Sequence, residues 1–207
     1  MGEKTIMEVT TFNINSDANP MAFAKRDAQV ESDFTSKQSG FIKRQSAVDE
    51  KGSYVVIVYW ENLKDADASM SKFMGDKSVA DYAQMIDAPT MKMSRYAIGK
   101  SFNANSSDFV EVMSFDTKSG IDMRKFDKIN QKVETGFTSN QDGFLQRITG
   151  VDEQGKQVVA VYWDNKTNSD AALQPFMENP ISKKFMGMMN ESSIQMGRYQ
   201  TLTALIK

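Results

Sequence analysis

Two stretches of the chain decide its fold, GFIKRQSAVDEKGSYVVIVYWEN at residues 40–62 and GFLQRITGVDEQGKQVVAVYWDN at residues 143–165. They align without a gap, and the same offset of 103 residues also aligns Glu8 with Glu111 and Tyr96 with Tyr199. Similarity at one fixed offset is typical of a repeated structural unit. The sequence therefore predicts a tandem duplication of one fold.

Each copy predicts the same order of elements, strand, helix, strand, strand, helix and strand. The opening strands, at 5–14 and 109–117, are rich in β-branched and aromatic residues. Asn19 and Pro20 have the residue types of a helix N-cap and first helical position, and Asn179 and Pro180 repeat that pair later in the chain. The segments 48–52 and 151–155 are short polar turns containing glycine, which indicates hairpins.

The third strand of each copy, VVIVYW or VVAVYW, is apolar at every position and predicts a central strand covered on both faces. We therefore expect an α+β fold in which two ferredoxin-like βαββαβ repeats pack their antiparallel sheets into one intrachain α/β barrel. The expected domains are residues 1–99 and 108–207. A linker is expected at 100–107, where Gly, Ser and Asn predominate.

The composition excludes several functions. With 207 residues, a net charge of −2 and a pI near 5.3, the chain offers no basic surface for nucleic acid. It has no cysteine and no histidine, which removes thiolate and imidazole chemistry and the common transition-metal ligands. We expect no metal site, no membrane span and a cytoplasmic protein, or a periplasmic one if a leader precedes the numbered residues. A single barrel or a homodimer of such barrels is expected.

The chain resembles a known group at a small set of positions. These are the Gly-Phe pair that begins the second strand, the tryptophan that closes the third, an Ala-rich helix and the break ENPISKKF before the last strand, with anchors at Gly40, Phe41, Trp60, Gly143, Phe144 and Trp163. The pattern resembles the antibiotic-biosynthesis-monooxygenase-like (ABM) group of the dimeric α/β barrel superfamily. The resemblance covers nearly all of both copies, but its anchors are structural and therefore specify the fold better than the reaction.

The resemblance implies a range of activities. Members include cofactor-free monooxygenases of phenolic or anthrone-like aromatics, heme-degrading enzymes and proteins without an assigned activity. The heme-degrading branch relies on Asn, Trp and an iron-binding His, and this sequence contains no histidine. Heme degradation is therefore disfavoured, and no cofactor is expected.

Trp60 and Trp163 are the first candidate site residues. Each ends a central strand, where we expect the barrel interior to open and an aromatic ligand to stack. Tyrosine precedes each tryptophan and asparagine follows two positions later, which adds Tyr59, Asn62, Tyr162 and Asn165. The resemblance implies that Trp and Asn contribute to a pocket in which a phenol is oriented or deprotonated. The alternative is that each tryptophan only fills the core.

Arg44 and Arg147 are the second pair of candidates. By the two-residue period of a strand, each shares a face with apolar residues, so a buried guanidinium needs a partner. That partner is either the oxyanion of a ligand or a carboxylate such as Glu8 or Glu111. The same alternatives apply to Arg95 and Arg198 on the last strands, taken as ligand-binding candidates.

Two functional hypotheses follow. The first is a small-molecule-binding barrel that oxidises a flat aromatic without metal or flavin, and the second is a non-catalytic barrel that binds a ligand or another protein. A barrel interior lined by Arg, Tyr and Asn would favour catalysis, and one filled by Met and Phe would favour the second hypothesis. Ala160 in place of Ile57 leaves extra room and favours the second copy as the ligand side.

Overall fold

The computed structural model describes residues 4–99 and 106–207. Most of the linker expected at 100–107 lies outside these residues. The chain divides into two compact units, the first comprising described residues up to 106 together with 199–207, and the second comprising 107–198. The last nine residues, which the sequence assigned to the second copy, thus group with the first unit.

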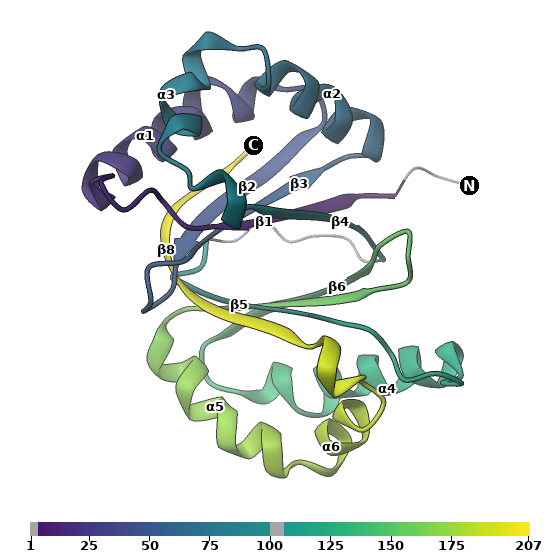
Figure 1. Cartoon of the computed structure of the whole chain (residues 1–207). Helices are drawn as coiled ribbons and strands as arrows, with labels where there is room; N and C mark the ends of the chain where they lie inside the picture. Colours follow the sequence, from purple (N-terminus) through teal and green to yellow (C-terminus); the bar gives the residue numbers. More distant parts are fainter. Residues whose placement is uncertain (1–3, 100–105) are drawn as a thin grey trace. The chain divides into compact units, whose positions relative to one another are not determined.

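In the first unit (Figure 1), three helices cover one face of an antiparallel sheet, and the last strand of the chain adds to its edge. The elements are β1 (Ile6–Phe12), α1 (Pro20–Asp33), β2 (Phe41–Val48), β3 (Tyr54–Trp60), α2 (Leu63–Phe73), α3 (Ala80–Gln84) and β4 (Lys92–Ile98). β1 pairs with β3 and β4, and β2 pairs with β3. The C-terminal part of β8 (Gln195–Ile206) pairs with β2, from Val48 opposite Gln200 to Lys43 opposite Ile206.

The second unit has the same order of elements. They are β5 (Phe109–Phe115), α4 (Met123–Gly136), β6 (Phe144–Val151), β7 (Gln157–Trp163), α5 (Lys166–Glu178) and α6 (Pro180–Met186), followed by the start of β8. β7 is the middle strand and pairs with β5 and β6, so that Trp163 lies opposite both Phe109 and Phe144. In the first unit Trp60 holds the equivalent place opposite Ile6 and Phe41.

The strands are hydrogen-bonded in the order β1-β3-β2-β8-β5-β7-β6-β4 and close into an eight-stranded antiparallel barrel. The described residues also form six α-helices. The expected α+β barrel is therefore confirmed, whereas the tandem duplication stays a prediction. No helix in the described parts of the chain has the length and apolar character that a bilayer span requires.

Local sequence explains where several elements begin. The side chain of Asn19 accepts hydrogen bonds from the backbone N–H groups of Met21 and Ala22, which caps α1 ahead of Pro20. Asn179 caps α6 in the same way. Gly40 and Gly143, just before β2 and β6, have φ angles of 67° and 72°, a left-handed conformation that favours glycine.

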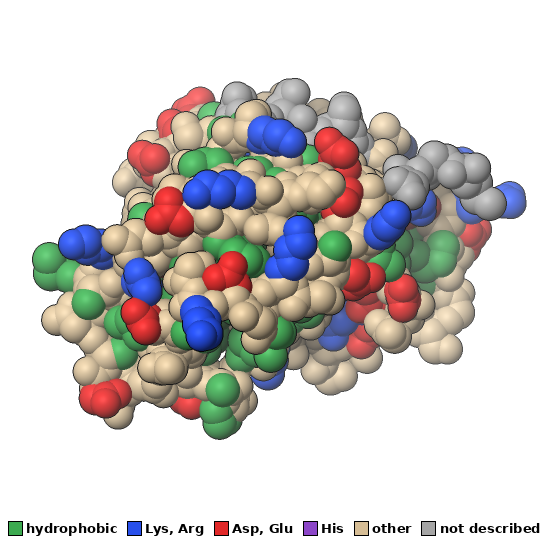
Figure 2. Space-filling view, turned by 90° about the horizontal axis from the view of Figure 1, so that it is seen from above, with side chains coloured by type: hydrophobic (Ala, Val, Ile, Leu, Met, Phe, Trp, Pro, Cys, Tyr) green, Lys and Arg blue, Asp and Glu red, His purple; other side chains and the backbone are tan. Residues whose placement is uncertain are grey.

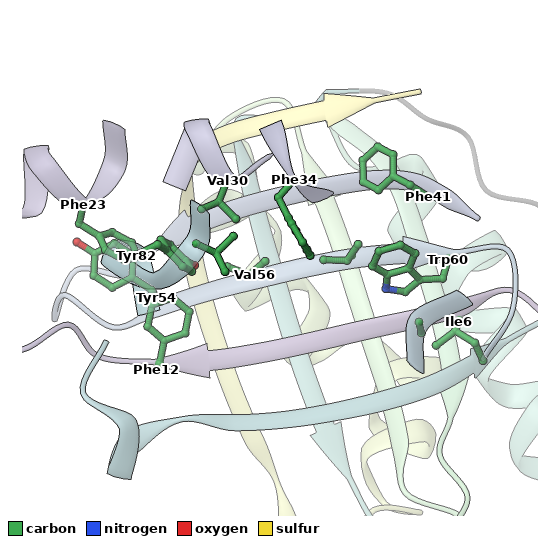
Figure 3. Packing of buried hydrophobic residues seen from close by; sticks show 13 residues of the cluster. Ile6, Phe12, Phe23, Val30, Phe34, Phe41, Tyr54, Val56, Trp60 and Tyr82 are labelled. Atoms are coloured by element: carbon green, nitrogen blue, oxygen red, sulfur yellow. The ribbon is translucent and has the colours of Figure 1, made fainter. Parts of the chain in front are cut away.

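The core of the first unit lies between its sheet and its helices. Figure 3 shows Phe23 and Val30 of α1 facing Tyr54, Val56 and Trp60 of β3. Every residue of β3 is buried, as predicted for a strand covered on both faces. On the face of the molecule drawn in Figure 2, acidic and basic side chains are interspersed, so this face carries no continuous basic patch.

Candidate ligand cavity in the second unit

A cavity of about 270 Å³ lies between the sheet and the helices of the second unit. Its walls are mainly apolar, and they include Met113, Val159, Val161, Phe176, Phe185 and Met189. Sites of this kind, apolar with a few polar groups, are the usual form of small-molecule pockets. Met186 and Met189 both line this space, and Met189 also belongs to the buried core of the second unit.

The cavity lies on one defined face of β7. Val159, Val161 and Trp163 line it, and because side chains alternate along a strand, Ala160 and Tyr162 belong to the other face. Ala160 is fully buried but does not line this cavity. The second unit thus holds a cavity, but this cavity and Trp163 lie on the helix-covered face of the sheet and not in the barrel interior where the sequence placed the site. The exchange of Ile57 for Ala160 does not create the cavity.

Trp163 gives the cavity an unused hydrogen-bond donor. Its side chain is 2% exposed and packs edge-on against Phe144, with ring centroids 6.1 Å apart. The indole Nε1 is buried and has no hydrogen-bond partner among the described residues. Nε1 of Trp60 in the first unit is unpaired as well, so the unpaired donor of Trp163 indicates a place for a ligand acceptor or a water molecule only together with the cavity beside it.

Arg147 gives the cavity a buried positive charge. Its side chain donates to the backbone oxygen of Asn130 at 3.3 Å and to Asn130 Oδ1 at 2.6 Å, and its Cζ lies 5.5 Å from the centre of the Phe185 ring. Burial lowers the pKa of Arg147 to about 10, and the charge of Glu134 opposes this effect. Both of these hydrogen bonds, in contrast to those of Arg44, are thus to a neutral residue, Asn130.

Glu111 lines the same cavity but is already paired. Its Oε1 accepts a hydrogen bond of 2.6 Å from Ser169 Oγ and one of 2.9 Å from Arg198 Nε. Arg198 also forms an ion pair of 2.7 Å with Asp170 on α5. The expected pairing of Arg147 with Glu111 is therefore wrong, because the last strand brings Arg198 to that carboxylate instead.

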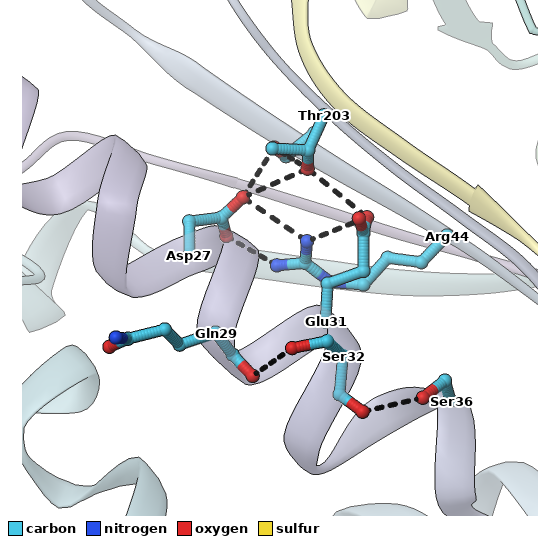
Figure 4. A network of polar contacts seen from close by, with 8 residues as sticks. Asp27, Gln29, Glu31, Ser32, Ser36, Arg44 and Thr203 are labelled. Atoms are coloured by element: carbon cyan, nitrogen blue, oxygen red, sulfur yellow. Dashed lines mark hydrogen bonds and ion pairs between the residues drawn. The ribbon is translucent and has the colours of Figure 1, made fainter.

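In the first unit, Arg44 sits in a buried ionic network (Figure 4). Its guanidinium donates to both carboxylate oxygens of Asp27 and lies 3.4 Å from Glu31 Oε2. Thr203 of β8 lies 3.1 Å from the same Glu31 oxygen. Glu8, the partner that the sequence suggested, is instead bonded to Arg95 at 2.6 Å. The reason is that α1 presents Asp27 and Glu31, one turn apart, directly over Arg44.

The charges of this network influence one another. Burial alone would raise the pKa of Asp27, but the adjacent Arg44 charge and its hydrogen bonds outweigh that effect and lower the pKa. For Glu31 burial dominates, and its pKa is raised despite Arg44. The pKa of Arg44 itself is raised, because the two carboxylates outweigh the effect of burial. Arg44 is thus neutralised within the protein, unlike Arg147.

The remaining candidates have structural surroundings. Asn62 and Asn165 are the N-caps of α2 and α5, and each accepts a hydrogen bond of 2.9 Å from a backbone N–H three residues later. Trp60 lies in the helix-covered core beside Ile6 and Phe41 (Figure 3), so the expectation that it faces the barrel interior is wrong. Two further candidates, Tyr59 and Tyr162, are buried on the opposite face of their strands.

Of the predicted site residues, the structure brings Trp163 and Arg147 to one cavity. Sequence reasoning missed Asn130, although the repeat itself marks it, since an offset of 103 residues places Asn130 opposite Asp27. Among the residues that the structure describes, no cluster of three or more acidic, His or Cys side chains could hold a metal ion.

Comparisons with known proteins give likeness in structure alone. No protein-family profile and no curated protein sequence matches the chain. Among solved structures, a putative monooxygenase from Fusobacterium nucleatum is similar with a TM-score of 0.73 and 14% identity, covering 100% of this chain and 96% of that one. An anthrone oxidase-like protein gives a TM-score of 0.68 and 10% identity, covering 99% of this chain and 94% of that one.

A chlorite dismutase from Candidatus Nitrospira defluvii is also similar, with a TM-score of 0.65 and 11% identity, covering 98% of this chain and 93% of that one. Identities this low show the fold and no more. The fold is that of the dimeric α/β barrel proteins, completed here within one chain.

Proposed function

We propose that the chain is a monooxygenase-like barrel of the ABM group, which binds a flat, mainly apolar aromatic molecule in the cavity of the second unit. The observation that carries this proposal is the combination of apolar walls, an unpaired Trp163 N–H and the buried Arg147 guanidinium around one space. The names of the monooxygenase and anthrone oxidase-like neighbours are in line with it.

The cavity residues suit oxidation of an acidic phenol or of a methylene group between aromatic rings. Apolar walls bind the flat rings, and Arg147 stabilises the oxyanion that forms when the substrate loses a proton. Glu111, the carboxylate at the cavity, is our candidate for the group that accepts this proton. Oxidation of a methylene to a carbonyl consumes one O₂ and releases one water, so no external reductant is needed.

The test is a thermal-shift screen of the protein against polycyclic phenols, anthrones, quinols and hemin, followed by oxygen-uptake measurements with each compound that binds. A bound ligand raises the melting temperature according to its affinity. We expect a saturable shift with flat aromatics, weakened in Trp163→Phe and retained in the matched control Trp60→Phe. Oxygen uptake in step with product would support the monooxygenase, and no shift with any compound would overturn the proposal.

The second candidate is a barrel that binds the same kind of molecule without oxidising it. The abundance of Met and Phe in the cavity walls favours this alternative, since these side chains supply adaptable packing and no acid–base chemistry. A thermal shift that depends on Trp163, combined with no oxygen uptake, would select it. The oligomeric state and localisation expected from the sequence stay predictions.

A further inference from the structure

Two buried arginines at equivalent positions, one in each unit, have different partners. Arg44 and Arg147 hold equivalent places in the repeat, each mid-strand and at most 3% exposed. Arg44 meets Asp27, whereas Arg147 meets Asn130, which has the same shape as aspartate but no charge. The guanidinium fork of Arg147 is therefore oriented by an amide. Glu134 holds the repeat position of Glu31 and its charge acts on Arg147, but the hydrogen bonds of this guanidinium go to Asn130 and not to a carboxylate.

The surroundings of the two arginines differ as well. Tyr82, which packs in the core of the first unit, is Phe185 in the second, and the guanidinium of Arg147 lies over that ring. Such a contact stabilises a cation but does not neutralise it. An ionised side chain that is buried without an opposite charge is costly, and such charges are normally paired. Arg147 also lines the cavity of about 270 Å³, so a molecule that enters the cavity can reach it.

We propose that the molecule bound in this cavity carries a permanent carboxylate, which pairs with Arg147 as the Asp27 side chain pairs with Arg44. This inference rests on the proposed function, since it assigns the substrate class of the same cavity. The ligand is then a flat aromatic monocarboxylic acid, with its apolar body against Val159, Val161 and Phe176, and Arg147 binds its carboxylate in place of an oxyanion formed in the reaction. Arginine suits this role because its planar fork matches a carboxylate and remains charged when buried.

The volume of the cavity limits the size of the apolar part of the ligand. A cavity of about 270 Å³ is near the lower limit of typical small-molecule sites, roughly 300–1,000 Å³. It therefore suits two or three fused rings. Suitable probes are matched pairs in which only the charge differs, namely 2-naphthoate and 2-naphthamide, and anthracene-2-carboxylate and its amide.

The experiment measures the dissociation constants of these pairs by calorimetry for the wild type, Asn130→Asp and Asn130→Ala. We expect the wild type to bind the best acid at least about tenfold more tightly than its amide. Asn130→Asp supplies the missing carboxylate from the protein, so it should weaken binding of the acid about tenfold or more and leave the amide almost unchanged. Asn130→Ala removes the amide without adding a charge and should retain the preference for the acid.

The melting temperatures of the unliganded variants test independently whether Arg147 needs a counter-charge. If it does, the new carboxylate of Asn130→Asp stabilises the protein, and this variant should melt at a higher temperature than Asn130→Ala. Equal binding of acid and amide by the wild type, or acid binding that survives Asn130→Asp, would overturn the inference and leave the cavity as a site for neutral aromatics. Binding of no compound, in either form, would overturn both this inference and the proposed function.

Discussion

At the scale of single residues, the main difference between the two units is that Asp27 of the first corresponds to Asn130 of the second. Asp27 belongs to a buried ionic network, whereas Asn130 lies beside the candidate site. Arg44 is held by two carboxylates of α1, and one of them, Glu31, also accepts a hydrogen bond from Thr203 of β8. Arg147 is hydrogen-bonded to the amide of Asn130, lies over an aromatic ring and borders a cavity, with the charge of Glu134 acting on it. On our proposal, one atom type at this position decides whether the arginine supports the fold or binds a ligand.

Asp27→Asn should be strongly destabilising. The substitution leaves Arg44 buried with only the more distant Glu31, and breaking a buried pair by removing one charge costs about 3–5 kcal/mol. Urea denaturation of the wild type and the variant would measure this loss in the free energy of unfolding. The exposed Asp33→Asn, which removes a partner 3.9 Å from Lys37, is the matched control and should cost well under about 1 kcal/mol. Similar losses in the two variants would contradict the account.

Asp27 should also make the free energy of unfolding depend on pH in the acidic range. Arg44, Glu31 and Tyr82 face Asp27, and the net effect lowers its pKa in the folded protein. A lowered carboxylate pKa contributes stability above the ordinary value of about 4, and that contribution is lost as the pH falls through the folded value. The difference in unfolding free energy between wild type and Asp27→Asn should therefore shrink below about pH 4. A difference that is constant from pH 7 to pH 3 would show that the Asp27 charge does not matter.

At the scale of elements, the helices begin at side-chain caps and the hairpin strands begin after left-handed glycines. Asn62 and Asn165 each follow a central strand and start the next helix, at the same repeat position. Gly40 and Gly143 each sit where a side chain of the following helix approaches. These positions recur in both units because the turn geometry requires them.

Asn165→Ala should affect the helix and leave the cavity unchanged. Loss of the N-cap costs about 1 kcal/mol of stability, and Asn62→Ala should cost a similar amount. Ligand affinity, measured on both folded variants, should stay within about twofold of the wild type when the helix is intact. A loss of affinity confined to Asn165→Ala would show that this asparagine acts on the ligand, as the resemblance to the ABM group implies.

Gly143→Ala tests the tight turn before β6. Gly143 has a φ of 72°, and an added Cβ would collide with Asp164 and Asn168. Gly155 has a φ of 89° but open space around it, so Gly155→Ala isolates the backbone cost of about 1–3 kcal/mol. Thermal unfolding should show a larger loss for Gly143→Ala. Equal losses would mean that the close approach at Gly143 adds no constraint.

Much at this scale was predictable from the sequence, because local patterns decide it. The N-caps Asn19 and Asn179, the fully buried third strand and the glycine turns all follow from residue type and spacing. The partners of Arg44 and the face on which Trp60 lies depend on how α1 and the strands pack. The sequence contains little information on such long-range contacts. For Arg44 the one indication is the i, i+4 spacing of Asp27 and Glu31, which places two carboxylates on one face of α1.

At the scale of the whole molecule, the last strand does not follow the repeat boundary. Tyr199 to Lys207 belong to the first unit, where Thr203 contacts both Glu31 and Ser46. The periodicity of 103 residues cannot reveal this, because it places that segment at the end of the second copy. The barrel itself was predictable from the expected duplication, since a sheet with one uncovered face needs a partner and a second copy in the same chain would supply it.

Thr203→Val should therefore weaken the first unit although it lies at the end of the chain. The substitution keeps the shape of the side chain and removes a hydroxyl that contacts Glu31 at 3.1 Å and Ser46 at 3.0 Å. Leaving buried polar partners unsatisfied costs about 1–3 kcal/mol. Chemical denaturation would measure this, with the exposed Thr167→Val as comparison. No loss in Thr203→Val would show that the C-terminal residues do not stabilise the first unit.

The central claim is that the cavity of the second unit binds the ligand, and tryptophan fluorescence tests it most directly. In Trp60→Phe the remaining tryptophan lines the cavity, and in Trp163→Phe the remaining one lies in the core of the first unit. Titration with the best-binding aromatic compound should change the emission of Trp60→Phe in a saturable way and leave that of Trp163→Phe almost constant. A saturable change that comes from Trp60 alone would place the ligand elsewhere and contradict the account.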